Sequence, residues 1–345
     1  MTDVDVNLLG VGTALPGPPI TNADLTARFG LPGAWQDWID EFVGTKSRHF
    51  SVDLATGERL YTLVDLGELA GRRALEAAAT DPAQVDLVVM STSTPDQLMP
   101  ATVNMVADRL GIDGVPTYQL QAGCTGAVQT LDLAARLLST GRYRTALVLG
   151  GDSSAKHFDI SASLLTMPPE VQVNGMLFGD GVGAAVLSAH PAHGAAVLRH
   201  VVTRLEGLGR APGQVVEWFG WGDRASELPP VSEDFKAVER AVPTMTCEAF
   251  EELLAVLGWA RTDIDFVLPP QLSGKMTARI LEQLAVPYAQ DVSCVTDIGN
   301  TGNALAFFQL QELLKLLAPG DRAVGVSIEA SKWVKAGYAI EIPAL

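Results

Sequence analysis

Short runs of valine, leucine and isoleucine recur along the chain without the alternation of apolar and polar residues that marks a half-exposed strand. Such runs occupy residues 86–90, 146–149 and 184–187. Uninterrupted apolar runs of this length are typical of strands buried on both faces. Between them lie longer segments with helical spacing of apolar positions, at residues 61–79, 101–110, 128–139, 247–257 and 305–317. The pattern predicts an α/β protein with helices on both faces of its sheets.

Three pairs of segments resemble each other and occur in the same order in the two halves of the chain. The pairs are residues 85–90 with 264–269, 124–127 with 300–303, and 145–150 with 322–327; residue 264 follows residue 85 by 179 positions, residue 300 follows residue 124 by 176, and residue 322 follows residue 145 by 177. A near-constant spacing indicates a duplication. We therefore predict two similar halves, residues 1–180 and 181–345, stacked as five layers in the order α/β/α/β/α.

Composition narrows the class of protein. The 345 residues are 48% hydrophobic and 19% charged, which is typical of a globular chain with a sizeable core. A formal net charge of −16 argues against a nucleic-acid partner. No apolar run reaches the ~18 residues of a membrane span, and the first residues do not resemble a signal peptide. Three cysteines suit a reducing compartment, so we expect a cytoplasmic protein without a membrane or metal site.

One of the cysteines has the setting of a nucleophile. Cys124 lies in the segment Ala122-Gly123-Cys124-Thr125-Gly126-Ala127, between a strand-like segment and a helical one. A thiol at a helix N-terminus meets aligned N–H groups, which lower its pKa and favour the thiolate. Glycines beside it let a substrate approach the main chain closely. The alternative is a buried structural cysteine.

The predicted duplication gives Cys124 a partner. Asn300 opens the equivalent helical segment of the second half. A pseudo-twofold axis between the halves would direct both helix N-termini towards one site. We therefore expect a thiol and an amide donor to converge there.

Four segments together resemble the thiolase superfamily and, within it, β-ketoacyl-acyl-carrier-protein synthase III. They are residues 9–16 (LGVGTALP), 122–127 (AGCTGA), 177–184 (LFGDGVGA) and 299–303 (GNTGN). The resemblance covers nearly the whole chain and implies a five-layered, thiolase-like duplicated fold. It also implies that the cysteine accepts an acyl group, while a histidine and an asparagine stabilise the enolate formed when a malonyl thioester loses CO₂.

The resemblance fails at the histidine. The family's Pro-His-Gln-Ala-Asn stretch matches residues 269–273, so Pro270 stands where the imidazole would be and Ser273 where the asparagine would be. The family's glycine-rich C-terminal loop, which lies against the active site, is replaced by bulkier residues here, including Trp333. Loss of one donor to a developing oxyanion costs about 10²–10³ in rate. Transfer of an acyl group to a cysteine needs only a reactive thiol and a nearby N–H.

We therefore predict an acyltransferase of secondary metabolism, in polyketide or antibiotic biosynthesis. Cys124 would be loaded from an acyl-CoA or from the phosphopantetheine of an acyl-carrier protein, and would pass the group to a hydroxyl, amine or carrier-thiol acceptor. The alternatives are a decarboxylative condensing enzyme that uses Asn300 and a non-catalytic partner subunit. Such partner subunits lose the nucleophile, so Cys124 argues against the last.

Further site residues follow from the resemblance. His157 lies in a loop that borders the site mouth in the family, and it is our candidate base. Trp38 and Lys156 match positions that contact the CoA end of the donor, although an ordinary helix aromatic would also explain Trp38. An arginine of the family is replaced by Phe42. The segment 159–174 crosses to a partner subunit in the family, so we expect a homodimer that acts on a small-molecule acceptor.

Overall fold

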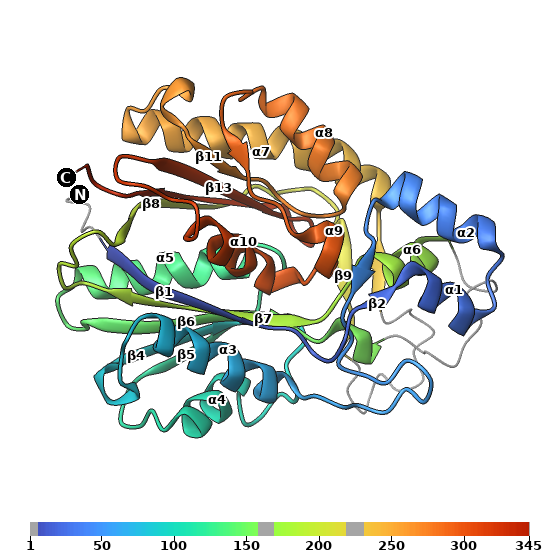
Figure 1. Cartoon of the computed structure of the whole chain (residues 1–345), viewed down its shortest axis with the longest axis horizontal. Helices are drawn as coiled ribbons and strands as arrows, with labels where there is room; N and C mark the ends of the chain where they lie inside the picture. The colour runs from blue at the N-terminus through green and yellow to red at the C-terminus, as the bar shows by residue number, and fades with distance from the viewer. Residues whose placement is uncertain (1–5, 158–168, 219–230, 345) are drawn as a thin grey trace.

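The computed structural model describes residues 6–157, 169–218 and 231–344. Its elements form five layers (Figure 1). Two layers of strands enclose a central layer of helices, and a further layer of helices covers the outer face of each. In that view α7 (Phe235–Leu257) and α8 (Gly274–Leu284) form the upper layer. Between the strands lie α5 (Gly126–Ser139) and α10 (Leu305–Leu313), and the lower layer consists of α3 (Leu63–Ala77) and α4 (Thr102–Leu110). The predicted α/β/α/β/α architecture is confirmed.

The strands show the duplication directly. Ten of them form one hydrogen-bonded sheet in the order β12-β11-β13-β14-β8-β1-β7-β6-β4-β5. The first five strands in this order repeat the last five in reverse, and the two groups meet where β1 pairs with β8. The strands are β1 (Val6–Ala14), β4 (Leu87–Ser91), β5 (Thr117–Leu120), β6 (Thr145–Asp152), β7 (Gly181–Ser188), β8 (Ala196–Leu205), β11 (Phe266–Leu268), β12 (Gln290–Asp291), β13 (Arg322–Glu329) and β14 (Val334–Glu341).

The strand pairing moves the boundary between the halves. The predicted boundary lies between residues 180 and 181, directly before β7. However, β7 pairs antiparallel with both β1 and β6, so it completes the sheet of the first half. The predicted boundary therefore falls one strand too early, because the buried apolar sequence of β7 gives no sign of which sheet it joins. The chain passes to the second half between β7 and β8.

Five of the six main helices lie at the predicted positions, with one large difference in extent, and the sixth, α8, was not predicted. The six helices are α3 (Leu63–Ala77), α4 (Thr102–Leu110), α5 (Gly126–Ser139), α7 (Phe235–Leu257), α8 (Gly274–Leu284) and α10 (Leu305–Leu313). We expected α7 to begin at residue 247, but it begins twelve residues earlier and includes Pro243. Proline normally breaks a helix because it lacks an N–H. Here Val242, Pro243 and Met245 are buried among the apolar residues that α7 packs on the sheet, and this packing favours a continuous helix.

Shorter elements cap the end of the molecule that carries the site. They are β2 (Ile20–Thr21), α1 (Asn22–Phe29), α2 (Gly33–Trp38), the π-helical turn Ile39–Val43, β3 (Ser47–Arg48), the turn Ser154–His157, α6 (Pro169–Leu177), β9 (Gln214–Val216), β10 (Val231–Glu233) and α9 (Val295–Ile298). Two further 3₁₀ turns are Pro82–Gln84 and Arg261–Asp263, and a third, Gly302–Ala304, precedes α10. In the described part of the chain, no helix is long and apolar enough to cross a bilayer.

Candidate functional site

Cys124 lies in the turn between β5 and α5. It lines three adjoining cavities, with volumes of about 320, 50 and 10 Å³. The walls of the largest are mainly apolar side chains from α6, α7, α8 and the π-helical turn: Phe42, Val43, Val173, Leu177, Phe178, Phe235, Val238, Val242, Leu272, Met276 and Ile328. The thiol therefore lies where an acyl chain could be held away from water.

The turn that carries the thiol is held from the other half of the molecule. Asn303, fully buried before α10, donates through Nδ2 to the carbonyl of Ala122 at 2.6 Å and accepts from Ser91 Oγ at 2.7 Å. A Cβ on Gly126 would lie 1.6 Å from Asn303 Oδ1, so only glycine fits there. The glycine of this motif thus allows the central helices to approach closely, and Asn303 was not predicted as a site residue.

Asp152, at the end of β6, gathers hydrogen bonds from both halves of the site. Its Oδ1 accepts from Ser93 N and Oγ, both at 2.9 Å, from Thr94 Oγ1 at 3.0 Å and from Thr92 Oγ1 at 3.2 Å. Its Oδ2 accepts from Asn303 N at 2.9 Å and Nδ2 at 2.7 Å. A buried carboxylate with this many donors is a fixed structural anion.

The charge state of the thiol differs from the one we predicted. Burial, followed by the carboxylates of Glu329, Asp152 and Glu233, raises the pKa of Cys124 well above its usual value. We expected α5 to lower that pKa, but the helix begins two residues later, at Gly126, and the nearby negative charges oppose the thiolate. The resting cysteine is therefore a neutral thiol at pH 7.

Two of these carboxyl groups line the main cavity together with Cys124, and the sequence analysis missed both. Glu329 ends β13 and is 4% exposed, and its carboxylate contacts Gly123, where a Cβ would lie 2.0 Å from Oε2. Glu233 ends β10 and accepts from Gln214 Nε2 at 3.4 Å. A signal for Glu329 was present in the sequence, because it is an acidic residue directly after the strand-like segment of residues 323–328.

Asn300 lines the same cavity as Cys124, so the structure brings together the two residues that the duplication paired. Its main chain is fixed by hydrogen bonds from its N–H to Leu177 O at 2.9 Å and from Gly179 N–H to its carbonyl at 3.0 Å. Its Oδ1 accepts from Gly302 N at 3.0 Å. The amide Nδ2 is therefore the atom that Asn300 can offer to a substrate oxygen.

His157 lines the second cavity, together with Cys124 and Asp152. Its Nε2 is buried and has no hydrogen-bond partner among the described residues. Burial, and then the neighbouring Lys156 charge, lower the pKa of His157, so the imidazole is neutral at pH 7. The residue has the position of a candidate base, although on a different side of the thiol from Glu329 and Glu233.

Comparison with known proteins identifies the family. The family model for 3-oxoacyl-[acyl-carrier-protein] synthase III matches residues 118–204, and the model for its C-terminal part matches residues 254–333. A β-ketoacyl-[acyl-carrier-protein] synthase III of Rhodospirillum rubrum is 33% identical over 299 residues, which are 86% of either chain. The chain belongs to the β-ketoacyl-[acyl-carrier-protein] synthase III family. It is an acyltransferase of the synthase III type, and the family acts on acyl thioesters of CoA and acyl-carrier protein.

Solved structures agree with this assignment. The tetronic acid condensing enzyme AbyA1 is 56% identical, with a TM-score of 0.95 over 97% of this chain and 99% of that one. The 3-oxoacyl-(acyl carrier protein) synthase III of Pseudomonas aeruginosa is 28% identical, with a TM-score of 0.84 over 98% of both chains. The predicted thiolase-like fold of this synthase III is thereby confirmed.

In this synthase III the residues at the predicted histidine and asparagine positions lie beside the thiol. Pro270 lines the smallest cavity together with Cys124, and its carbonyl accepts from Thr277 Oγ1 at 3.3 Å. Ser273 lines the main cavity and caps α8, where its Oγ accepts from Met276 N at 3.2 Å. Neither side chain offers the site a group that titrates near neutral pH, as an imidazole does.

The predicted donor-binding residues are not brought to the cavity walls of this synthase III. Trp38 packs edge-on against Trp35 at 5.2 Å and contacts Phe42, which does line the main cavity. Lys156 donates to the carbonyls of Thr94 and Pro95, both at 2.7 Å. Its ammonium is thus already used in positioning that loop.

Trp333 also lies outside the walls of the three cavities. Its ring is 2% exposed and lies 3.9 Å from the Arg210 guanidinium, and its Nε1 donates to Ala211 O at 2.7 Å. The tight turn between β13 and β14 gives Trp333 a φ of 63° and directs its side chain into the core of the second half. The residue of this loop that reaches the thiol is Glu329 instead.

Proposed function

We propose that this synthase III loads an acyl group from a thioester onto Cys124 and passes it to an acceptor without decarboxylating a malonyl unit. The observation that carries this proposal is the set of carboxyl groups around the thiol: Glu329, Glu233 and Asp152. In their ionised forms these groups repel a malonyl carboxylate and oppose the enolate that decarboxylation creates. Pro270, at the position expected for an imidazole, supplies no compensating donor.

The acceptor we propose carries a hydroxyl group, rather than the amine or carrier thiol that the sequence also allowed. AbyA1, which is 56% identical, is described as a tetronic acid condensing enzyme. A tetronic acid is a five-membered lactone, so its assembly includes transfer of an acyl group to a hydroxyl oxygen as well as a carbon–carbon bond. Acyl transfer through Cys124 supplies the first of these bonds. A role in secondary metabolism is therefore part of the proposal.

The donor we propose is an acyl-CoA or the phosphopantetheine thioester of an acyl-carrier protein, as used by the family. The main cavity, about 320 Å³ and mainly apolar, suits the acyl chain. In this proposal Asn300 donates through Nδ2 to the thioester carbonyl oxygen, and His157 remains a candidate base. Trp38, Lys156 and Trp333 remain predictions for donor binding, as does the homodimer.

A decarboxylative condensation is the second candidate. It is favoured by one observation, the presence of Asn300 in the same cavity as Cys124. In this reaction Asn300 alone would stabilise the enolate. The loss of CO₂ from a malonyl thioester distinguishes it from the first proposal.

Intact-mass measurements test the proposal. Incubation with acyl-CoA and acyl-carrier-protein thioesters is expected to add one acyl mass, and Cys124→Ala is expected to abolish the adduct while Cys247→Ala retains it. A malonyl thioester should either give no adduct or give a malonyl adduct that keeps its carboxyl group. Release of CO₂ would show that the protein is a condensing enzyme. Absence of an adduct with every thioester would instead support the reading as a non-catalytic partner subunit.

A further inference from the structure

The carboxyl groups of Glu329 and Glu233 are placed to carry the protons of this reaction. We propose that Glu329 exchanges a proton with Cys124 during acylation and that Glu233 takes the proton of the acceptor hydroxyl. The two glutamates would thus replace the imidazole that is missing at Pro270. This inference rests on the proposed acyl transfer through Cys124.

Glu329 has the geometry of a functional group. It is 4% exposed, and its Oε1 is held by the Ser331 N–H at 2.9 Å. Its Oε2 makes no other hydrogen bond of standard geometry among the described residues and lies against Gly123, next to Cys124, whose main-chain N–H helps to stabilise the carboxylate. The carboxylate is therefore placed directly beside the thiol-bearing residue.

Glu233 completes the pair from a different element. It lies on β10 and faces the same cavity as Cys124 and Glu329, with Gln214 as its hydrogen-bond partner. Burial, together with the negative charge of Glu329, raises the pKa of Glu233 to about 7. Burial also raises the pKa of Glu329. A carboxyl group with a pKa near neutral pH, as at Glu233, can both accept and return a proton during turnover, and a raised pKa makes Glu329 a stronger base than an exposed glutamate.

The thiol needs such a group. Because the pKa of Cys124 is raised well above its usual value, the thiolate is rare at pH 7 and must be generated during the attack. A neighbouring carboxylate that merely repels the thiolate would slow the reaction. A carboxylate that accepts the thiol proton in the transition state would accelerate it.

The proton balance closes in both half-reactions. In acylation, the S–H proton of Cys124 moves to Glu329, its sulfur bonds to the thioester carbon, and the C–S bond to the donor breaks. The leaving pantetheine thiolate then takes the proton from Glu329. In deacylation, the acceptor O–H proton moves to Glu233 while its oxygen bonds to the acyl carbon. The bond to Cys124 breaks, and the proton returns through the pair to the Cys124 thiolate.

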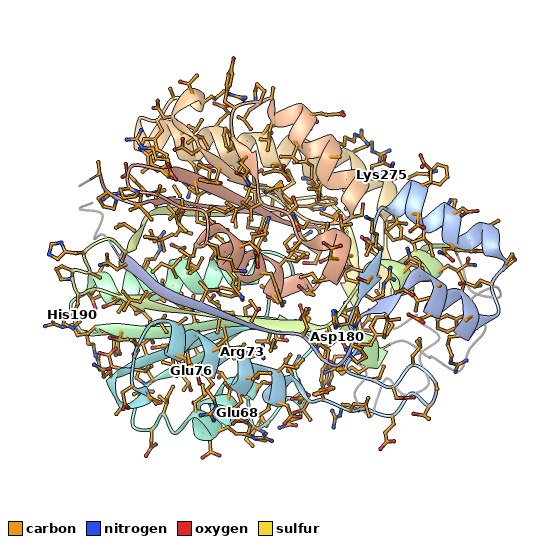
Figure 2. All side chains as sticks on the ribbon, in the orientation of Figure 1. Glu68, Arg73, Glu76, Asp180, His190 and Lys275 are labelled. Carbon is orange, nitrogen blue, oxygen red and sulfur yellow. The ribbon has the colours of Figure 1, made fainter. Side chains whose placement is uncertain are left out.

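Other charged groups surround the pair and bear on its titration. Asp152 and His157 approach the thiol from the first half of the molecule. At the outer end of the main cavity, Glu239 pairs with Arg279 at 2.7 Å, and Lys275 lies 3.7 Å from Glu41. Figure 2 shows Lys275 on α8, close to α2 and the π-helical turn that follows it. The described residues thus place these cations at the outer end of the cavity and the carboxyl pair at the thiol.

Single-turnover kinetics with intact-mass detection test the pair from pH 5.5 to 9. With a saturating acyl-CoA, Glu329→Gln is expected to slow acylation at pH 7 by about 100-fold or more, the usual contribution of a general base. Glu233→Gln is expected to leave acylation within a few-fold but to slow transfer to a hydroxyl acceptor by a similar factor. The acylation rate of the Glu329→Gln variant should rise steadily with pH, because only hydroxide-generated thiolate then reacts.

Whether Glu329→Gln slows or speeds acylation distinguishes a general base from a group that acts only through its charge. If Glu329 acted only through its charge, Glu329→Gln would lower the pKa of Cys124 and speed acylation, which would overturn the proposal. The proposal would also be overturned if His157→Gln slowed acylation by about 100-fold while Glu329→Gln acylated at the wild-type rate. Glu251→Gln is the matched control, since Glu251 is an exposed glutamate that pairs with Arg261 on the surface.

The failure of this inference can be told from the failure of the proposed function. If the wild-type protein takes no acyl group from any thioester, the proposed function fails. If Cys124 is acylated at the same rate in wild type and Glu329→Gln, and deacylation is equal in Glu233→Gln, the proposed function stands and the glutamate pair is wrong. Circular dichroism and thermal unfolding of each variant identify a folding defect separately.

Discussion

Asn303 and Asp152 are joined by two hydrogen bonds, from the Asn303 N–H at 2.9 Å and from its Nδ2 at 2.7 Å, both to Asp152 Oδ2. The pair links the start of α10, in the second half of the molecule, to the end of β6 in the first. Through Ala122 O it also fixes the turn that carries Cys124. The nucleophile therefore depends on the contact between the halves.

Asn303→Ala is expected to lower the free energy of unfolding by about 3 kcal/mol, because it leaves Asp152 and Ser91 with unmet buried hydrogen bonds. Acylation of Cys124 should fall as well, since its turn loses its anchor. Urea unfolding followed by circular dichroism measures the change. Asn104→Ala is the matched control, because the Asn104 hydrogen bond to Thr117 is exposed; a loss of equal size there would contradict the prediction.

Gly299→Ala is expected to destabilise the protein and misplace Asn300. Gly299 has a φ of 73°, and an added Cβ would lie 2.8 Å from the Cβ of the buried Arg48. We expect a loss of more than about 3 kcal/mol in the free energy of unfolding. Gly258→Ala, with a φ of 67° and nothing within 4 Å of the added Cβ, should cost only about 1 kcal/mol. Equal losses would show that backbone strain alone is responsible.

The titration of Asp180 should make stability depend on pH between about 4 and 6. Burial raises the pKa of Asp180 to about 6, although Ser51 N–H and Ala155 N–H donate to its carboxylate at 2.7 and 3.0 Å. The folded state thus keeps a proton that the unfolded chain loses near pH 4. The stability that this proton supplies is complete below pH 4 and falls, by about 3 kcal/mol, as pH rises to 6.

Asp180→Asn removes that titration and provides the comparison. The difference in free energy of unfolding between wild type and Asp180→Asn should shift against the wild type by about 3 kcal/mol between pH 4 and pH 6. Other carboxyl groups cancel in this difference. A difference that stays constant over this range would contradict the raised pKa of Asp180.

Alkylation reports the charge state of the nucleophile. Because the pKa of Cys124 is raised, its reaction with iodoacetamide in the free enzyme should be slow at pH 7 and should still be rising at pH 9. Peptide mass mapping distinguishes Cys124 from Cys247 and Cys294, and Cys124→Ser supplies the background. A rate that levels off near pH 7 would show a stable thiolate and restore the helix N-terminus as the dominant influence.

Some of the site could be predicted from the sequence because it depends on local pattern. The apolar runs at residues 86–90 and 146–149 predict buried strands, and the spacing of the repeats alone pairs Cys124 with Asn300. The structure indeed brings these two residues to one cavity. The boundary between the halves and the start of α7 could not be predicted, because they depend on which surface a segment packs against.

The sequence by itself determined the layered duplicated fold and pointed to Cys124 as the candidate nucleophile, since periodicity and glycine spacing act over a few residues. Only the tertiary structure decided the charge around that nucleophile. Glu233 and Glu329 lie more than 100 positions from Cys124 in the chain, yet they share its cavity. Their pKa values and that of the thiol depend on burial and on each other's charge, and both of these arise only when the two halves pack together.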